Sequence, residues 1–242
     1  MVRAGGMETL FTILRHRSIR KFKDVSIPES DVILILEAGI RAPSTGLTMP
    51  YTVIRVEDER LRRVIYEVSG EQEHVLEAPL LLLFLVDGNR NARIVARRSG
   101  KPLSTGLALL INGIICASVA AQNMVVAAEA LGYGTCYIGA IQRDPLRIIR
   151  EFGLPRLTFP VFALVFGVPD EEPEPRPRLP LSIMVHTDRY RELSDEELEE
   201  GISVMESSLP WLKTLYRYFS EGGSLDARSE PLYKALEMQG FL

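Results

Sequence analysis

Apolar positions along this chain alternate between helical and strand-like spacing, which predicts a layered protein of helices and strands. Residues 7–15 and 32–40 have amphipathic helical spacing, and Pro28 with the acids after it marks the start of the second helix. The β-branched run 52–56 predicts a strand, and the continuous apolar runs 80–86 and 159–166 predict strands buried on both faces. Residues 61–68 and 145–152 are expected as helices, 135–141 as a strand and the polar stretch 90–105 as a loop.

The longest apolar run, residues 106–131, predicts one long helix that glycines at 132 and 134 end. Four polar residues interrupt this run, so a core or subunit-interface helix is favoured over a membrane span: Asn112, Gln122, Asn123 and Glu129. Five prolines over 169–180 predict an extended connector. Helices are expected at 198–209, 211–219 and 231–239, with an N-cap at Ser194 before the first, and the whole pattern indicates an α/β or α+β fold.

Composition narrows the class of protein. The 242 residues, 46% hydrophobic and 25% charged, fit one large soluble domain or one domain with an appendage. A net charge of −4 argues against a nucleic-acid-binding protein, which would need a broad basic face. The only cysteines, Cys116 and Cys136, lie in apolar runs without zinc-like spacing, so we expect buried thiols, no metal site and a cytoplasmic protein.

Residues 16–22 carry the densest chemistry, with a histidine, two arginines, a lysine and a serine. Arginine binds phosphate through paired charge-assisted hydrogen bonds, so the segment favours a small phosphorylated ligand, with a solvated basic loop as the alternative. Polar segments at 44–46, 69–74, 137–140 and 176–178 punctuate the apolar elements, and the small residues at 44–46 and 137–140 would let a flat ligand approach the backbone. Taken singly, each segment is more simply read as a loop, a strand end or a linker.

Taken together and in order, these segments resemble the FMN-dependent nitroreductase family, in its flavin reductase/nitroreductase A branch. The matching residues are 16–20 (HRSIR), 41–44 (RAPS), 70–75 (GEQEHV), 121–123 (AQN), 127–132 (AAEALG), 137–139 (YIG), 177–180 (PRLP), 185–186 (VH) and 239–241 (QGF). The resemblance implies an α+β fold with a central mixed, mainly antiparallel sheet flanked by helices, assembled as an intertwined homodimer. It also implies an FMN-binding core over residues 1–192 and a helical extension over 193–242 that clasps the partner subunit.

The resemblance further implies which residues hold FMN. His16, Arg17, Ser18 and Arg178 would meet the phosphate and ribityl chain, Arg176 takes a family lysine position, and Arg20 would lie near the pyrimidine edge. Ser44, Thr45 and Gly46 would line the flavin ring, Gln72 its polar edge, and the backbone of Tyr137, Ile138 and Gly139 the side of N5. The family's chemistry passes two electrons from NAD(P)H through flavin N5 to nitroaromatics, quinones or free flavin, with donor and acceptor taking turns. A fixed cation, for which Arg20 is the candidate, would stabilise the reduced flavin, and no general acid is expected.

Two departures from the branch affect the choice of nucleotide. Residues 221–228 hold two acids and one arginine where the branch has a basic loop for the 2′-phosphate of NADPH, and Gln142 stands where the branch has an arginine. We therefore expect little discrimination between NADPH and NADH. Two alternatives to a general flavin oxidoreductase remain: an FMN-binding carrier or sensor without useful turnover, and a specialised member that acts on one metabolite, as iodotyrosine deiodinases and flavin-destructase-like enzymes do.

Overall fold

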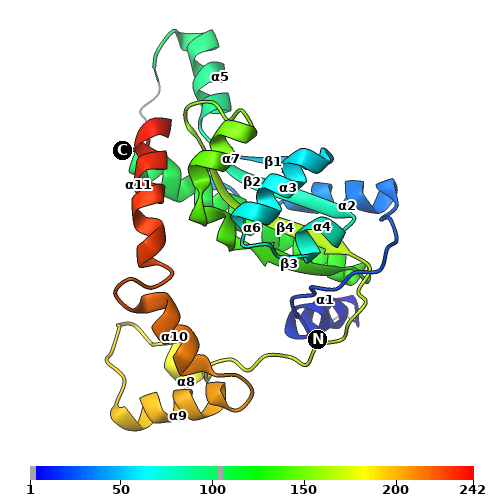
Figure 1. Cartoon of the computed structure of the whole chain (residues 1–242), viewed down its shortest axis with the longest axis vertical. Helices are drawn as coiled ribbons and strands as arrows, with labels where there is room; N and C mark the ends of the chain where they lie inside the picture. The colour runs from blue at the N-terminus through cyan, green and yellow to red at the C-terminus, as the bar shows by residue number, and fades with distance from the viewer. Residues whose placement is uncertain (1–3, 103–105) are drawn as a thin grey trace. The chain divides into compact units, whose positions relative to one another are not determined.

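The chain folds as two compact units in the computed structural model, which describes residues 4–102 and 106–242 (Figure 1). The first unit comprises residues 1–173 and 230–242, and the second comprises residues 174–229. All four strands and the helices that cover them belong to the first unit. The functional division expected at residue 192 stays a prediction.

A four-stranded sheet forms the centre of the first unit. Its strands are β1 (Tyr51–Arg55), β2 (Leu80–Asp87), β3 (Gly134–Ile138) and β4 (Thr158–Gly167), in the order β1-β2-β4-β3 with every pairing antiparallel. The expectation of a mixed sheet is therefore corrected for the described residues. Parallel pairing among the described residues is limited to one isolated bridge, between Ser18 and Thr135. The chain after the first helix meets the edge strand β3 too briefly there to form a strand.

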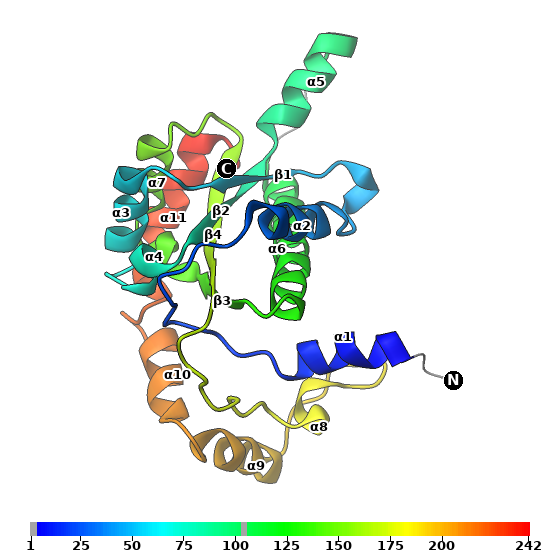
Figure 2. The same cartoon turned by 90° about the vertical axis from the view of Figure 1, so that its right-hand side faces the viewer.

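Helices cover both faces of the sheet (Figure 2). One face carries α2 (Glu29–Ile40) and α6 (Leu107–Ala130), and the other carries α3 (Glu59–Val68), α4 (His74–Glu77) and α7 (Pro145–Glu151). Successive strand residues enter opposite hydrophobic clusters, Leu82 and Phe84 on one side and Leu81 and Leu83 on the other. The central strands β2 and β4 are buried at every position, which explains why their sequences are continuous apolar runs.

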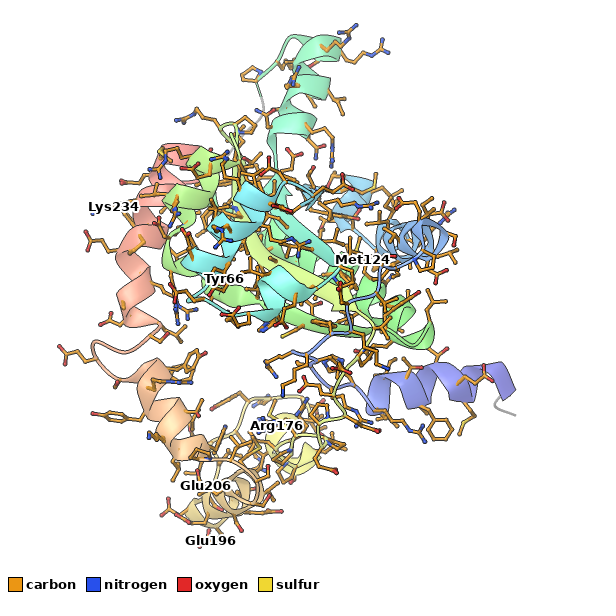
Figure 3. All side chains as sticks on the ribbon, turned by 45° about the vertical axis from the view of Figure 1, so that its right-hand side comes forward. Tyr66, Met124, Arg176, Glu196, Glu206 and Lys234 are labelled. Atoms are coloured by element: carbon orange, nitrogen blue, oxygen red, sulfur yellow. The ribbon has the colours of Figure 1, made fainter. Side chains whose placement is uncertain are left out.

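Helix α6 is a core helix, as predicted. By length and composition it is apolar enough to cross a membrane, yet nine of its residues are buried. A side chain at Gly113 would collide with Val86 of β2, and one at Gly39 of α2 would collide with Met124 of α6, whose place is marked in Figure 3. The opposite face of α6 leaves Leu107, Ile111 and Ile115 about half exposed at four-residue intervals, a set we call the α6 stripe.

The loop predicted at 90–105 is wrong over most of its length, because residues 89–99 form the helix α5 (Asn89–Ser99). None of its residues is buried, and its few apolar residues, Ala92, Ile94, Val95 and Ala96, stand among arginines and asparagines, which explains why the stretch resembles a polar loop in the sequence. The Arg90 N–H donates to Asp87 Oδ1 at 2.9 Å near its start, and Gly100 ends it in the left-handed conformation. Residues 103–105 of the predicted loop lie outside the described residues.

Other boundaries differ by a few residues. Helix α1 covers Ala4–Leu14, and the short 3-10 segments η1 (Thr45–Leu47) and η2 (Gly139–Arg143) follow α2 and β3, so β3 ends earlier than predicted. The second unit contains α8 (Leu181–Met184), α9 (Asp195–Glu206), α10 (Trp211–Phe219) and the start of α11 (Asp226–Gln239), which takes in Pro231 instead of beginning there. The predicted N-cap at Ser194 is confirmed as a reciprocal capping box with Glu197.

Candidate functional site

The segment that carries the predicted phosphate ligands lies against the edge strand β3. Ser18 bridges Thr135, and the Ile19 N–H donates to the Thr135 carbonyl at 2.9 Å. A glycine at 134 permits this approach, because a Cβ there would lie 2.6 Å from Ile19 Cγ1. The fold of the sheet edge therefore fixes the position of residues 16–20.

His16 is tied to the last turn of α6. Its Nδ1 lies 2.6 Å from Glu129 Oε1, and the Thr135 hydroxyl donates to the same oxygen at 3.3 Å. Glu129 is the only charged residue of α6 and lies at the helix end where the dipole disfavours an anion. In the sequence, Glu129 interrupts an apolar run and belongs to the matching motif 127–132, with no role of its own assigned. A single charged residue in an otherwise uncharged helix indicates that its carboxylate has a polar partner nearby.

Arg17 borders a cavity of about 920 Å³ at the same end of α6, which we call the polar cavity. Its guanidinium donates to the Pro173 carbonyl at 2.9 Å and lies 3.5 Å from a carboxylate oxygen of Glu172, whose side chain is 87% exposed. Exposed ion pairs contribute little free energy, so a phosphate dianion can replace this partner. Arg15 and Lys23 line the cavity as well, together with the acids Glu8, Glu129, Asp170, Glu171 and Glu172, so a phosphate group there would meet charges of both signs.

Arg20 and Gln72 lie around a buried histidine that the sequence analysis did not single out. The Arg20 N–H donates to Glu171 Oε1 at 2.5 Å, and the Gln72 amide donates to the Ser69 carbonyl at 3.0 Å. Burial first, and the charge of Arg20 second, lower the pKa of His74. Its Nε2 is buried and has no hydrogen-bond partner among the described residues. The polar turn 69–74 was recognised in the sequence, but nothing in it distinguished a buried imidazole from a solvated one.

The end of β3 provides an open stretch of backbone. Ile138 is buried, and a Cβ added at Gly139 would meet no atom within 4 Å, so a flat ring has room there. The Tyr137 hydroxyl donates to Gln122 Oε1 at 3.3 Å, and burial, with a contribution from Glu129, raises the pKa of Tyr137 to about 12. Burial also raises the pKa of the Cys136 thiol. Tyr137 thus stays a protonated phenol at neutral pH, and the thiolate form of Cys136 is disfavoured.

Ser44, Thr45 and Gly46 are held near the other end of α6. The Thr45 hydroxyl donates to Asn112 Oδ1 at 3.0 Å, and Thr45 borders a second, largely apolar cavity of about 1010 Å³, the apolar cavity. Glu129 lies seventeen positions after Asn112 along α6, so these two attachment points are about 25 Å apart at 1.5 Å per residue. One chain therefore does not bring residues 44–46 to residues 16–20.

Arg176 and Arg178 belong to the second unit (Figure 3). The Arg178 guanidinium donates to the carbonyl oxygens of Arg176 and Pro177 at 3.0 and 3.1 Å. Their predicted contact with the FMN phosphate stays a prediction. Over the described ranges 4–102 and 106–242, no group of three or more histidine, cysteine, aspartate or glutamate side chains is arranged to hold a metal ion.

Comparison with known proteins gives the family. Residues 13–168 match the model of the nitroreductase family. The chain is 33% identical over 199 residues to the NADPH-flavin oxidoreductase of Vibrio harveyi, covering 82% of this chain and 81% of that protein. It is also 33% identical over 205 residues to the FMN reductase (NAD(P)H) of Bacillus subtilis, covering 84% and 81%.

Solved structures agree over nearly the whole chain. Nitroreductase A from Vibrio parahaemolyticus superposes with a TM-score of 0.88 at 29% identity, covering 96% of this chain and 97% of that chain. The NADPH:FMN oxidoreductase of V. harveyi in complex with NAD+ superposes with a TM-score of 0.87 at 29% identity, covering 96% and 98%. The resemblance read from the ordered motifs is confirmed, and the chain belongs to the nitroreductase family.

Proposed function

We propose that this protein is an FMN-dependent NAD(P)H oxidoreductase that reduces nitroaromatics, quinones or free flavin, with donor and acceptor taking turns at one site. The observation that carries the proposal is the placement of the basic segment 16–20 along β3, the strand whose end leaves open backbone at Gly139. The residues proposed to bind the phosphate and the backbone proposed to face the ring thus lie along the same strand. The V. harveyi and B. subtilis relatives, flavin reductases by name, support the same reading.

The residues present fit FMN. Bound FMN would supply the redox chemistry by accepting two electrons from a nicotinamide and passing them to an acceptor. Arg17, Ser18 and His16 hold the phosphate and ribityl chain in this proposal, and the backbone at Gly139 leaves space for the ring. Arg20 supplies a cation that stabilises negative charge on the reduced ring electrostatically. Solvent supplies protons, so no side chain is assigned as a general acid.

We further propose that the working unit is a homodimer with two FMN sites. The predicted ring contacts at residues 44–46 and the phosphate contacts at residues 16–20 attach to α6 about 25 Å apart, farther than one FMN molecule reaches. A second copy related by a two-fold axis across the middle of α6 would bring residues 44–46 of one chain toward residues 16–20 of the other. The half-exposed α6 stripe gives this pairing an apolar contact surface.

The nucleotide donor follows from two side chains whose polar groups are already engaged. The Gln142 amide donates to the Val161 carbonyl at 3.1 Å, and the Arg228 guanidinium donates to the Ser224 hydroxyl at 3.0 Å. Asp226 accepts the Gly222 N–H at 2.8 Å within the same segment. The segment 221–228 thus contains two acids and one arginine whose guanidinium is already hydrogen-bonded. We therefore propose that the protein uses NADH and NADPH with little discrimination.

The visible absorption spectrum tests the proposed function. The protein is incubated with FMN, freed of excess and titrated anaerobically with NADH or with NADPH. We expect oxidised-flavin bands that bleach with either nucleotide and return when a quinone is added. A protein that retains FMN but never bleaches would be a carrier, and a protein that retains no FMN would contradict the proposed site.

A further inference from the structure

Glu129 poses an electrostatic problem in the proposed site. Its side chain is 13% exposed and, with Glu8, Asp170, Glu171 and Glu172, lines the polar cavity next to the proposed phosphate ligands. Like charges at short range repel, and the C-terminal end of α6 adds further negative potential. By Coulomb's law alone, Glu129 weakens phosphate binding.

The contacts of Glu129 point to a compensating role. Its Oε1 receives His16 Nδ1 at 2.6 Å and the Thr135 hydroxyl at 3.3 Å, so the carboxylate is fixed to α6, β3 and the basic segment at once. An imidazole nitrogen at that distance from a carboxylate carries the proton of a charge-assisted hydrogen bond. The other ring nitrogen, Nε2, makes no hydrogen bond to the described residues.

We propose that Glu129 is a positioning residue for flavin binding: it holds His16 by Nδ1 so that Nε2 is aimed and free to donate to the FMN phosphate. The inference rests on the proposed function, since it requires that residues 16–20 bind FMN. A carboxylate that orients a histidine through one ring nitrogen and leaves the other for a ligand is a recurrent arrangement in binding sites. Glu129 acts through His16 and touches neither the phosphate nor the reacting atoms.

The two effects of Glu129 on phosphate binding have opposite signs, which makes the proposal testable. E129Q keeps an oxygen that can accept a hydrogen bond from His16 Nδ1 but removes the negative charge that strengthens this bond and fixes the ring. If Glu129 acted only as a nearby negative charge, E129Q would tighten FMN binding. If it acts through His16, E129Q weakens FMN binding.

The experiment measures dissociation constants for FMN and for riboflavin by flavin fluorescence, in wild type, E129Q, H16A and H16A/E129Q. Riboflavin lacks the phosphate, so a general loss of structure raises both constants alike. We expect E129Q to raise the FMN constant about tenfold or more and to leave the riboflavin constant within about twofold. In the H16A background, E129Q should tighten FMN binding or leave it unchanged, because only the repulsion remains.

E8Q is the matched control. Glu8 lines the same polar cavity as Glu129, so E8Q removes the same charge while His16 Nδ1 keeps its partner. It is expected to tighten FMN binding or leave it unchanged. Thermal unfolding of each variant without flavin reports whether the fold is kept.

Three outcomes overturn the inference while leaving the proposed function intact: E129Q binds FMN as tightly as wild type, E129Q raises both constants equally, or E129Q weakens FMN binding to the same extent without His16. Failure of the proposed function looks different, because wild-type protein would then bind neither FMN nor riboflavin. E129D keeps a carboxylate at this position. A ratio of the FMN and riboflavin dissociation constants closer to wild type in E129D than in E129Q would support a carboxylate acting on the His16 ring.

Discussion

Substituting Gly134 with alanine tests how strictly the sheet edge places the proposed phosphate ligands. The new Cβ would lie 2.6 Å from Ile19 Cγ1 and 2.7 Å from Ile19 Cβ, whereas non-bonded carbon atoms settle about 3.5–4.0 Å apart. Ile19 is 5% exposed and has no route for its side chain into solvent. The segment itself must retreat by about 1 Å, which stretches the 2.9 Å hydrogen bond from the Ile19 N–H to Thr135 beyond a useful length.

Overpacking of this kind costs about 1–3 kcal/mol, which for a chain of this size lowers the melting temperature by about 2–12 °C. Because Arg17 and Ser18 move with Ile19, we also expect the dissociation constant of FMN to rise about tenfold. Thermal unfolding and fluorescence titration measure the two effects. G39A is the control, since its Cβ meets the flexible Met124 side chain away from residues 16–20 and should lower stability while sparing FMN affinity. Unchanged melting and unchanged FMN affinity in G134A would refute the described contact.

Four further results are expected. R20A should weaken FMN binding or slow flavin reduction by NAD(P)H, seen by titration and stopped-flow absorbance; wild-type behaviour would remove its assigned role. I115E should split the proposed dimer and abolish FMN retention, since it charges the α6 stripe; sedimentation that still shows a dimer would contradict this interface. The ratio of kcat/KM for NADPH over NADH should stay below about a hundredfold, equal to about 2.7 kcal/mol. Arg191 first, and the Ser194 N–H second, hold the pKa of Glu197 down to about 2, so these contacts stabilise the fold above the ordinary carboxyl range and their contribution is lost as pH falls toward 2. In an NMR titration, R191Q should raise the pKa of Glu197 toward its ordinary value, while the Ser194 N–H still lowers it; an unchanged pKa would contradict the described pair.

Elements specified by local pattern were predictable from the sequence. The buried strands β2 and β4 read as continuous apolar runs, α6 as one long apolar helix, and the start of α9 as a serine followed by acids. Helix α5 is harder to recognise, because its few apolar residues stand among charged and polar ones and none of them is buried, although their spacing is helical. The strand order β1-β2-β4-β3 depends on which faces pack together, and no single segment of sequence contains that information.

The sequence also does not show which residues of the candidate site lie close together. The sequence resemblance predicts the FMN ligands as one linear set, and the structure places two members of that set near opposite ends of α6, where Asn112 holds Thr45 and Glu129 holds His16. The pattern of the long apolar run predicts only a core or interface helix. Its polar residues Asn112 and Glu129, however, hold both halves of the proposed site. If two copies pair across the exposed face of α6, the separation of about 25 Å within one chain becomes the reason that two chains are needed. I115E and E129Q then disturb one site by different routes, the first by separating the copies and the second by changing only how an assembled site distinguishes FMN from riboflavin.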